Sequence, residues 1–232
     1  MPVEPVPVLE IDIVSDVVCP WCFVGKRQLE AALARWREAN PGAPAPQVRW
    51  RAFQLNPDMN PAGMPREEYL RLKFGRTDGG GIYERVKSAA RMVGLTLQIE
   101  QIRRQPNTLK AHALIELSAE AGVQDAMAEA LFVAYFVDGR DLSDDAVLRE
   151  IATGAGLSAD TAEAALVGEA VTRIVAAGEA EMREYGVTGV PLFIIGCEGA
   201  DRVAISGAQG ADALLAAIGQ VERQRQAVAR PA

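Results

Sequence analysis

Two of the chain's three cysteines stand three positions apart, in the stretch CPWC from Cys19 to Cys22. The stretch follows an apolar run and precedes a helical pattern, so it is expected at a strand-to-helix junction. There the first sulfur lies at the helix N-terminus, where unpaired N–H groups and the helix dipole favour a thiolate. Such a pair performs thiol–disulfide exchange, with Cys19 as the nucleophile and Cys22 as the thiol that resolves a mixed disulfide.

The two residues between the cysteines fit the same interpretation. Pro20 suits the first helical turn, because its missing N–H would have no intrahelical partner there. Trp21 is expected to be exposed and to shape a contact surface. Both are therefore predicted substrate-binding residues.

The cysteine pair has three alternative roles besides redox chemistry. The first is a structural disulfide, but a bridge across so short a loop removes little entropy from the unfolded chain, and cytosolic thiols stay reduced. The second is a zinc site, which would use all three cysteines and the only histidine: Cys19, Cys22, Cys197 and His112. Yet no second pair stands at ligand spacing, so no metal site is predicted. The third is a pair of inert buried thiols, which the helix-start position and Pro20 argue against.

Length and composition exclude several classes of protein. At 232 residues the chain can bury a core without a disulfide framework. No apolar run approaches about 20 residues, the length that spans a bilayer. The formal net charge of −7 at pH 7 provides no basic surface for nucleic acid, so neither a membrane nor a nucleic acid is an expected partner. The opening MPVEPVPVLEIDIV lacks the features of a signal peptide, and a cytoplasmic location is expected.

The elements around the cysteines predict a strand, helix, strand unit. VLEIDIV (8–14) alternates branched apolar and acidic residues, as a strand does. An amphipathic helix follows and ends at the breaker NPGAPAP. QVRWRAFQL (47–55) alternates again, and the length of the crossover suits parallel pairing with the first strand.

The rest of the chain predicts an α/β fold with a helical insertion. From about residue 57 to 186 helical patterns dominate. GVPLFIIG (189–196) and RVAISG (202–207) then predict a hairpin, and an amphipathic helix closes the chain. The simplest architecture pairs the first and last strands in one sheet. The predicted bounds are 8–56 and 187–226 for the two parts of the sheet domain, and 57–186 for the insertion.

This order of elements resembles the thioredoxin-fold oxidoreductases of the DsbA family, and most closely their FrnE-like cytosolic branch. The matching segments are SDVVCPWC, RAFQLNP, NTLKAHAL, GVTGVPLFII and ISGAQ. The resemblance covers roughly Leu9 to Gln224 and implies a thioredoxin fold with an inserted all-helical domain. It makes Cys19 the attacking thiol, Cys22 the resolving thiol and Pro191 a cis-proline that faces them.

The implied cis bond bears on substrate binding. It would expose the main chain of Val190 beside Cys19, so that an extended substrate could pair with it as an added strand. Thr188 and Val190 would border that groove. Specificity for substrates would then be loose.

Three further residues have alternative roles. Asn107 and His112 fall in a segment similar to the family's NT..AH pattern, which lies over the active site in the related isomerase and kappa-class glutathione transferase branches. They are therefore candidate substrate-binding residues, although Asn107 equally fits a helix N-cap and His112 a core position. Asp16 either disfavours a nearby thiolate by like-charge repulsion or caps the loop.

The sequence also departs from the family. Secreted DsbA proteins usually carry His between the cysteines, where this chain has Trp21, and a weaker oxidant is expected. Some FrnE-like relatives have a second cysteine pair near the C-terminus. Here Cys197 stands alone and is expected to be an inert turn residue.

The predicted function is thiol–disulfide exchange with protein or small thiols, through a mixed disulfide on Cys19. No bound cofactor is expected, glutathione is a candidate co-substrate, and the protein is expected to be a monomer or a homodimer. The alternative is a glutathione-dependent isomerase or transferase of the hydroxychromene carboxylate isomerase or kappa class, whose members usually have serine at the position of Cys19. A zinc-binding, non-catalytic module is the third hypothesis.

Overall fold

A four-stranded sheet forms the centre of the protein. The computed structural model describes residues 8–77, 81–198 and 200–228. Strands β1 (Glu10–Ser15) and β2 (Gln47–Ala52) are parallel, whereas β5 (Leu192–Gly196) is antiparallel to both β1 and β6 (Val203–Ser206). The strand order is β2-β1-β5-β6. The first and last strands therefore share one sheet, as the sequence predicts.

Strand β1 is buried on both faces, although its sequence alternates apolar and acidic residues. Ile11 and Ile13 belong to the main hydrophobic core. Asp12 is only 4% exposed, because it lies beneath three arginines that approach its carboxylate to 3.1–3.2 Å: Arg49, Arg51 and Arg202. A buried carboxylate requires such pairing. The acidic positions thus belong to a central strand.

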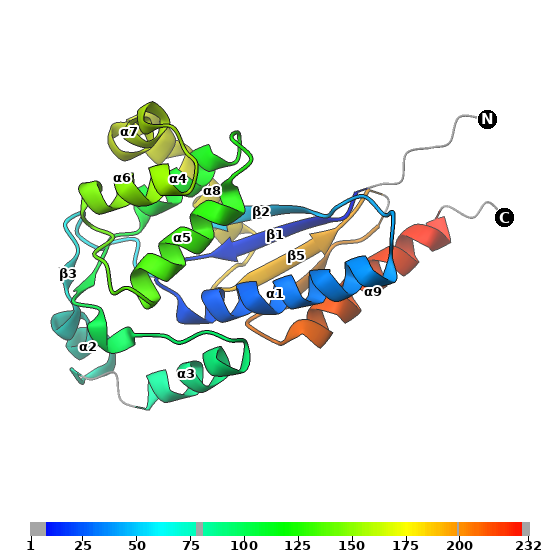
Figure 1. The fold of residues 1–232 in the computed structure, drawn as a ribbon, viewed down its shortest axis with the longest axis horizontal. Helices are drawn as coiled ribbons and strands as arrows, with labels where there is room; N and C mark the ends of the chain where they lie inside the picture. Colours follow the sequence, from blue (N-terminus) through cyan, green and yellow to red (C-terminus); the bar gives the residue numbers. More distant parts are fainter. Residues whose placement is uncertain (1–7, 78–80, 199, 229–232) are drawn as a thin grey trace.

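Two long helices cover one face of the sheet (Figure 1). Helix α1 (Pro20–Ala39) connects β1 to β2 and contacts the terminal helix α9 (Ala211–Val228), which runs past the predicted bound at residue 226. The indole N–H of Trp36 in α1 donates a hydrogen bond to Glu222 in α9 at 2.8 Å. The crossover through α1 places the CPWC stretch at the end of β1.

Between β2 and β5 the chain is mostly helical. The helices are α2 (Arg66–Phe74), α3 (Ile82–Met92), α4 (Leu109–Ser118), α5 (Gln124–Phe136), α6 (Asp145–Gly154), α7 (Ala159–Val167) and α8 (Glu169–Glu184), with a 3₁₀ turn, η1 (Ile99–Gln101). In the part of the chain that the structure describes, none of the helices has both the length and the apolar character needed to cross a bilayer.

The insertion also contains a small sheet that the sequence did not predict. Strands β3 (Met64–Pro65) and β4 (Arg104–Gln105) pair antiparallel. Two residues are too few for an alternating pattern to show. The insertion is otherwise helical, as the sequence predicts, and this two-residue pairing is an addition to it.

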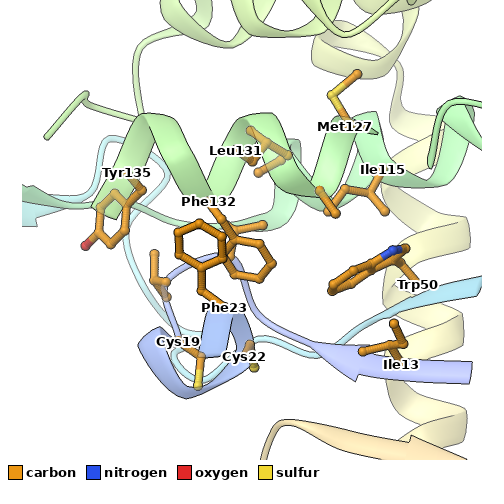
Figure 2. Close-up of a cluster of buried hydrophobic side chains, with 14 of the residues drawn as sticks. Ile13, Cys19, Cys22, Phe23, Trp50, Ile115, Met127, Leu131, Phe132 and Tyr135 are labelled. Carbon is orange, nitrogen blue, oxygen red and sulfur yellow. The ribbon is translucent and has the colours of Figure 1, made fainter. Parts of the chain in front are cut away.

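Aromatic packing joins the insertion to α1 (Figure 2). The ring of Phe23 in α1 stacks on that of Phe132 in α5, with 5.1 Å between the ring centroids and 7° between the planes. Phe136 of α5 and Trp50 of β2 complete the cluster, with centroids 6.4 Å and 5.9 Å from that of Phe132. The helix that carries the cysteines therefore shares its core with the insertion.

Candidate active site

The CPWC stretch forms the N-terminal end of α1. After β1, a tight turn is closed by a hydrogen bond from the Cys19 N–H to the Asp16 carbonyl at 2.9 Å. Cys19 is the N-cap residue with an extended backbone, and Pro20 begins the helix. The Cys22 N–H donates to the Cys19 carbonyl at 3.0 Å. This arrangement puts Cys19 at the positive end of the helix dipole of α1.

The two thiols of the stretch are free and differ in their surroundings. Cys19 is 5% exposed and Cys22 only 1% exposed. Burial raises the pKa of the Cys22 thiol well above its usual value, and its hydrogen bond with Cys19 raises that pKa further. The Cys22 thiol therefore keeps its proton at neutral pH, which suits it to the second step of an exchange rather than the first.

A loop from the other end of the chain faces Cys19. The Val190–Pro191 peptide bond is cis, and the Cys19 thiol donates to the Val190 carbonyl oxygen at 3.6 Å. The Pro191 carbonyl accepts the N–H of Gly207 at 2.8 Å, which ties this loop to the end of β6. Val190 is half-buried and Thr188 is exposed. The structure thus brings Cys19, Val190 and Pro191 together.

Pro20 and Trp21 are both half-buried. The Trp21 ring packs against the main hydrophobic core. The expectation that Trp21 is exposed was therefore wrong, because an indole is large enough to contact the core while keeping part of its edge in solvent. Their contact with substrate stays a prediction.

Asn107 is held by hydrogen bonds within the chain. Its side-chain oxygen accepts the N–H of Leu109 at 2.9 Å and the amide of Gln54 at 3.2 Å. Its amide nitrogen donates to the Met59 carbonyl at 2.6 Å. The bond to Leu109 satisfies an N–H of the first turn of α4, although the N-cap residue is Thr108 and Asn107 precedes it. Its contact with substrate stays a prediction.

His112 lies inside the protein, against Asp16. Both residues are buried, and the His112 Nε2 lies 3.3 Å from the Asp16 Oδ1. The Asp16 Oδ2 accepts the N–H of Leu55 at 2.8 Å, so its side chain ties the turn after β1 to the segment that follows β2. His112 is thus a buried helix residue, as one hypothesis held. Asp16 connects His112 to the cysteine turn, because its carbonyl accepts the N–H of Cys19.

Gly25 is a residue that the sequence reasoning missed. A Cβ at this position of α1 would lie 2.9 Å from the ring of Phe193 and 3.3 Å from Pro191. Glycine therefore allows α1 to approach the loop that faces Cys19. The available signal was a glycine inside an amphipathic helical pattern, where it costs stability unless close packing requires it.

The four residues considered for zinc do not come together. Because β5 runs antiparallel to β1, Cys197, which follows β5, lies at the end of the sheet opposite to Cys19. Within residues 8–77, 81–198 and 200–228, no group of three or more His, Cys, Asp or Glu side chains is arranged to hold a metal ion. Cys197 itself is half-buried in the β5–β6 turn.

Comparison with known proteins relates this chain to redox proteins. A family profile described as a DSBA-like thioredoxin domain matches residues 10–219. The uncharacterized protein YwbO of Bacillus subtilis (strain 168) is 26% identical over 218 residues, which are 94% of this chain and 99% of that protein. The probable DsbA oxidoreductase SCO1869 from Streptomyces coelicolor is 32% identical, with a TM-score of 0.81 over 97% of this chain and 92% of that one. The cytosolic disulfide reductase DsbM from Pseudomonas aeruginosa, solved with GSH, shares the fold at 19% identity, with a TM-score of 0.61 over 94% and 96% of the two chains.

Proposed function

The chain belongs to the family of DsbA-like thioredoxin domains, and on this premise we propose that it is a thiol–disulfide oxidoreductase that works through Cys19 and Cys22. One observation carries the proposal. Two free thiols share the first turn of α1, and the outer one lies 3.6 Å from the Val190 carbonyl. This arrangement supports a nucleophilic role for Cys19, a resolving role for Cys22 and docking of substrate on the main chain of Val190.

The exchange proceeds in two steps. The Cys19 thiolate attacks one sulfur of a substrate disulfide, which forms a mixed disulfide and releases the other substrate sulfur as a thiolate. The Cys22 thiol then loses its proton and attacks the Cys19 sulfur, which closes the Cys19–Cys22 disulfide and releases the second substrate thiolate. Two electrons pass from the dithiol to the substrate, and the reverse sequence oxidises a substrate dithiol.

Substrates dock through the main chain of Val190. Its carbonyl is held beside the Cys19 thiol, where an extended segment can add to the loop by main-chain hydrogen bonds. Thr188, which is exposed, borders the loop on one side, and the half-buried Pro20 and Trp21 flank Cys19 in α1. Main-chain recognition accepts many sequences, so the expected substrates are protein or peptide disulfides of broad sequence.

Glutathione is the expected small-molecule partner. Two glutathione molecules would return the Cys19–Cys22 disulfide to the dithiol, leaving glutathione disulfide. The likeness in fold to DsbM, which was solved with GSH and is named as cytosolic, supports both this partner and a cytoplasmic site of action. Neither step calls for a bound cofactor.

Trapping of the mixed disulfide tests the proposal. With glutathione disulfide, a Cys22→Ser variant should accumulate one glutathione on Cys19, detected by intact-mass spectrometry and peptide mapping, because no thiol remains to resolve it. Cys19→Ser should accumulate none. Cys197→Ser is the matched control and should behave as the wild type. A Cys22→Ser protein that stays unmodified would instead direct attention to the glutathione-dependent isomerase or transferase class.

A further inference from the structure

A buried acid and a buried histidine lie behind the cysteines. The Asp16 side chain is completely inaccessible and that of His112 is 2% exposed, with 3.3 Å between Oδ1 and Nε2. Neither of these two atoms has a conventional hydrogen-bond partner among the described residues. Each group can therefore offset the cost of burying the other. A buried acid or histidine without a polar partner would cost folding free energy.

Asp16 connects this pair to both cysteines. Its carbonyl accepts the N–H of Cys19 at 2.9 Å, and its carboxylate accepts the N–H of Leu55 at 2.8 Å. A hydrogen bond with the backbone of Asp16 also lowers the pKa of the Cys22 thiol, against the larger effect of burial, which raises it. A charge on Asp16 is thus fixed in position one turn before the helix that carries the thiols.

Within the described part of the chain, the elements around Asp16 provide it with no second cation. From α5, Tyr135 faces it as a neutral phenol whose pKa is raised by burial. Arg66 of α2 reaches Tyr135, at 3.5 Å, and the side chain of Gln105 instead. On α8, Glu179 is paired with Arg183 at 2.6 Å. Among the described residues, His112 alone lies within ion-pair distance of Asp16.

We propose that Asp16 and His112 form a buried ion pair that sets the midpoint potential of the Cys19–Cys22 couple. His112 is a positioning residue in this role: it compensates the charge of Asp16 and does not touch the substrate. A thiolate can form at Cys19 only in the dithiol form, so an uncompensated negative charge on Asp16, which repels that thiolate, disfavours the dithiol relative to the disulfide. This inference rests on the proposed function, because it concerns the same couple.

Two substitutions should shift the potential in opposite directions. His112→Gln leaves the carboxylate uncompensated, so the disulfide should be favoured by on the order of tenfold, which lowers the midpoint by about 30 mV. Asp16→Asn keeps an acceptor for the Leu55 N–H but removes the negative charge, so the dithiol should be favoured by on the order of tenfold, which raises the midpoint by about 30 mV. The double variant carries neither charge and should return close to the wild-type midpoint.

The measurement is the equilibrium between dithiol and disulfide in glutathione buffers at neutral pH. Lys110→Gln is the matched control, because it removes an exposed cation from the same helix, and its midpoint should equal that of the wild type. A purely structural pair would lower the unfolding temperature of both variants without opposed shifts in potential. If His112→Gln does not fold, the rise expected for Asp16→Asn decides the matter.

The outcomes separate this inference from the proposed function. A wild-type protein that titrates reversibly, with Asp16→Asn unshifted or with both single variants shifted the same way, overturns the ion-pair inference alone. A wild-type protein that shows no reversible couple overturns the proposed function.

Discussion

The Cys19 thiol lies 3.6 Å from the carbonyl oxygen of Val190, a residue 171 positions later in the chain. The sheet creates this proximity, because β5 runs antiparallel to β1 and so begins beside the point where β1 ends. The turn after β1 then places Cys19 at the start of α1. The contact between Cys19 and Val190 therefore depends on the pairing of β5 with β1 and on the position of α1.

The resolving step should accelerate with pH. Burial raises the pKa of Cys22, so at neutral pH only a small fraction of this thiol is the attacking thiolate, and that fraction grows as pH rises toward the raised pKa. We expect the conversion of the Cys19 mixed disulfide to the Cys19–Cys22 disulfide to quicken about tenfold per pH unit between about pH 6 and 8. Rapid mixing with glutathione disulfide, acid quench and mass spectrometry measure it. The Cys22→Ser variant isolates the first step, and a rate that levels off below pH 8 would contradict the assignment.

Gly25→Ala should destabilise the protein and slow the exchange. The added methyl would meet the Phe193 ring at 2.9 Å, and because Phe193 is fully buried the ring cannot move aside. Overpacking should outweigh the gain in helix propensity, for a net loss of about 1–2 kcal/mol, and should shift α1 from Pro191. Urea unfolding and the rate of mixed-disulfide formation measure both effects.

Gly178→Ala is the matched control for this substitution. Gly178 also lies inside a helix, α8, but a methyl there would meet no atom within 4 Å. It should gain about 0.5–1 kcal/mol of stability and leave the exchange rate unchanged. Equal responses of the two glycines would show that α1 does not need close contact at Gly25.

Phe132→Leu should weaken the sheet domain and the insertion together. The Phe132 ring stacks on Phe23 and contacts Trp50, so its loss should cost about 1–3 kcal/mol. Tryptophan fluorescence reports on the sheet domain, while far-ultraviolet circular dichroism reports mainly on the helices. We expect both transitions to shift to lower urea and to remain coincident.

The exposed residue Leu72 gives the control for Phe132. Leu72 is 68% exposed, so its replacement by alanine should change the free energy of unfolding by less than about 0.5 kcal/mol.

Fluorescence and circular dichroism transitions that separate in the Phe132→Leu variant would show that the insertion folds independently of the sheet domain.

Local sequence patterns predicted the first strand, the first helix and the second strand, because these elements form from residues that are close together in the chain. The alternation in VLEIDIV and QVRWRAFQL, and the breaker after the first helix, gave β1, α1 and β2 close to their observed bounds. The position of CPWC between a strand and a helix gave the first turn of α1. The match of the later segments to a family gave Pro191, which periodicity alone does not distinguish from other prolines.

The remaining features arise from contacts between distant segments. Asp16 lies in the β1–α1 turn and His112 lies in α4. The sequence around either residue does not predict that the two lie together. Likewise, the burial of the Trp21 ring follows from how α1 sits against the core, and β3 and β4 are too short to show a pattern. The need for glycine at position 25 follows from its close contact with Phe193, which lies far away in the sequence.

The most direct measurement is the redox state of Cys19 and Cys22 at equilibrium across a series of glutathione buffers, read by alkylation and mass spectrometry. We expect a reversible two-electron transition between the dithiol and the Cys19–Cys22 disulfide, absent from the Cys22→Ser variant and retained in Cys197→Ser. If no Cys19–Cys22 disulfide formed at any ratio of glutathione to glutathione disulfide, the protein would not be a dithiol oxidoreductase.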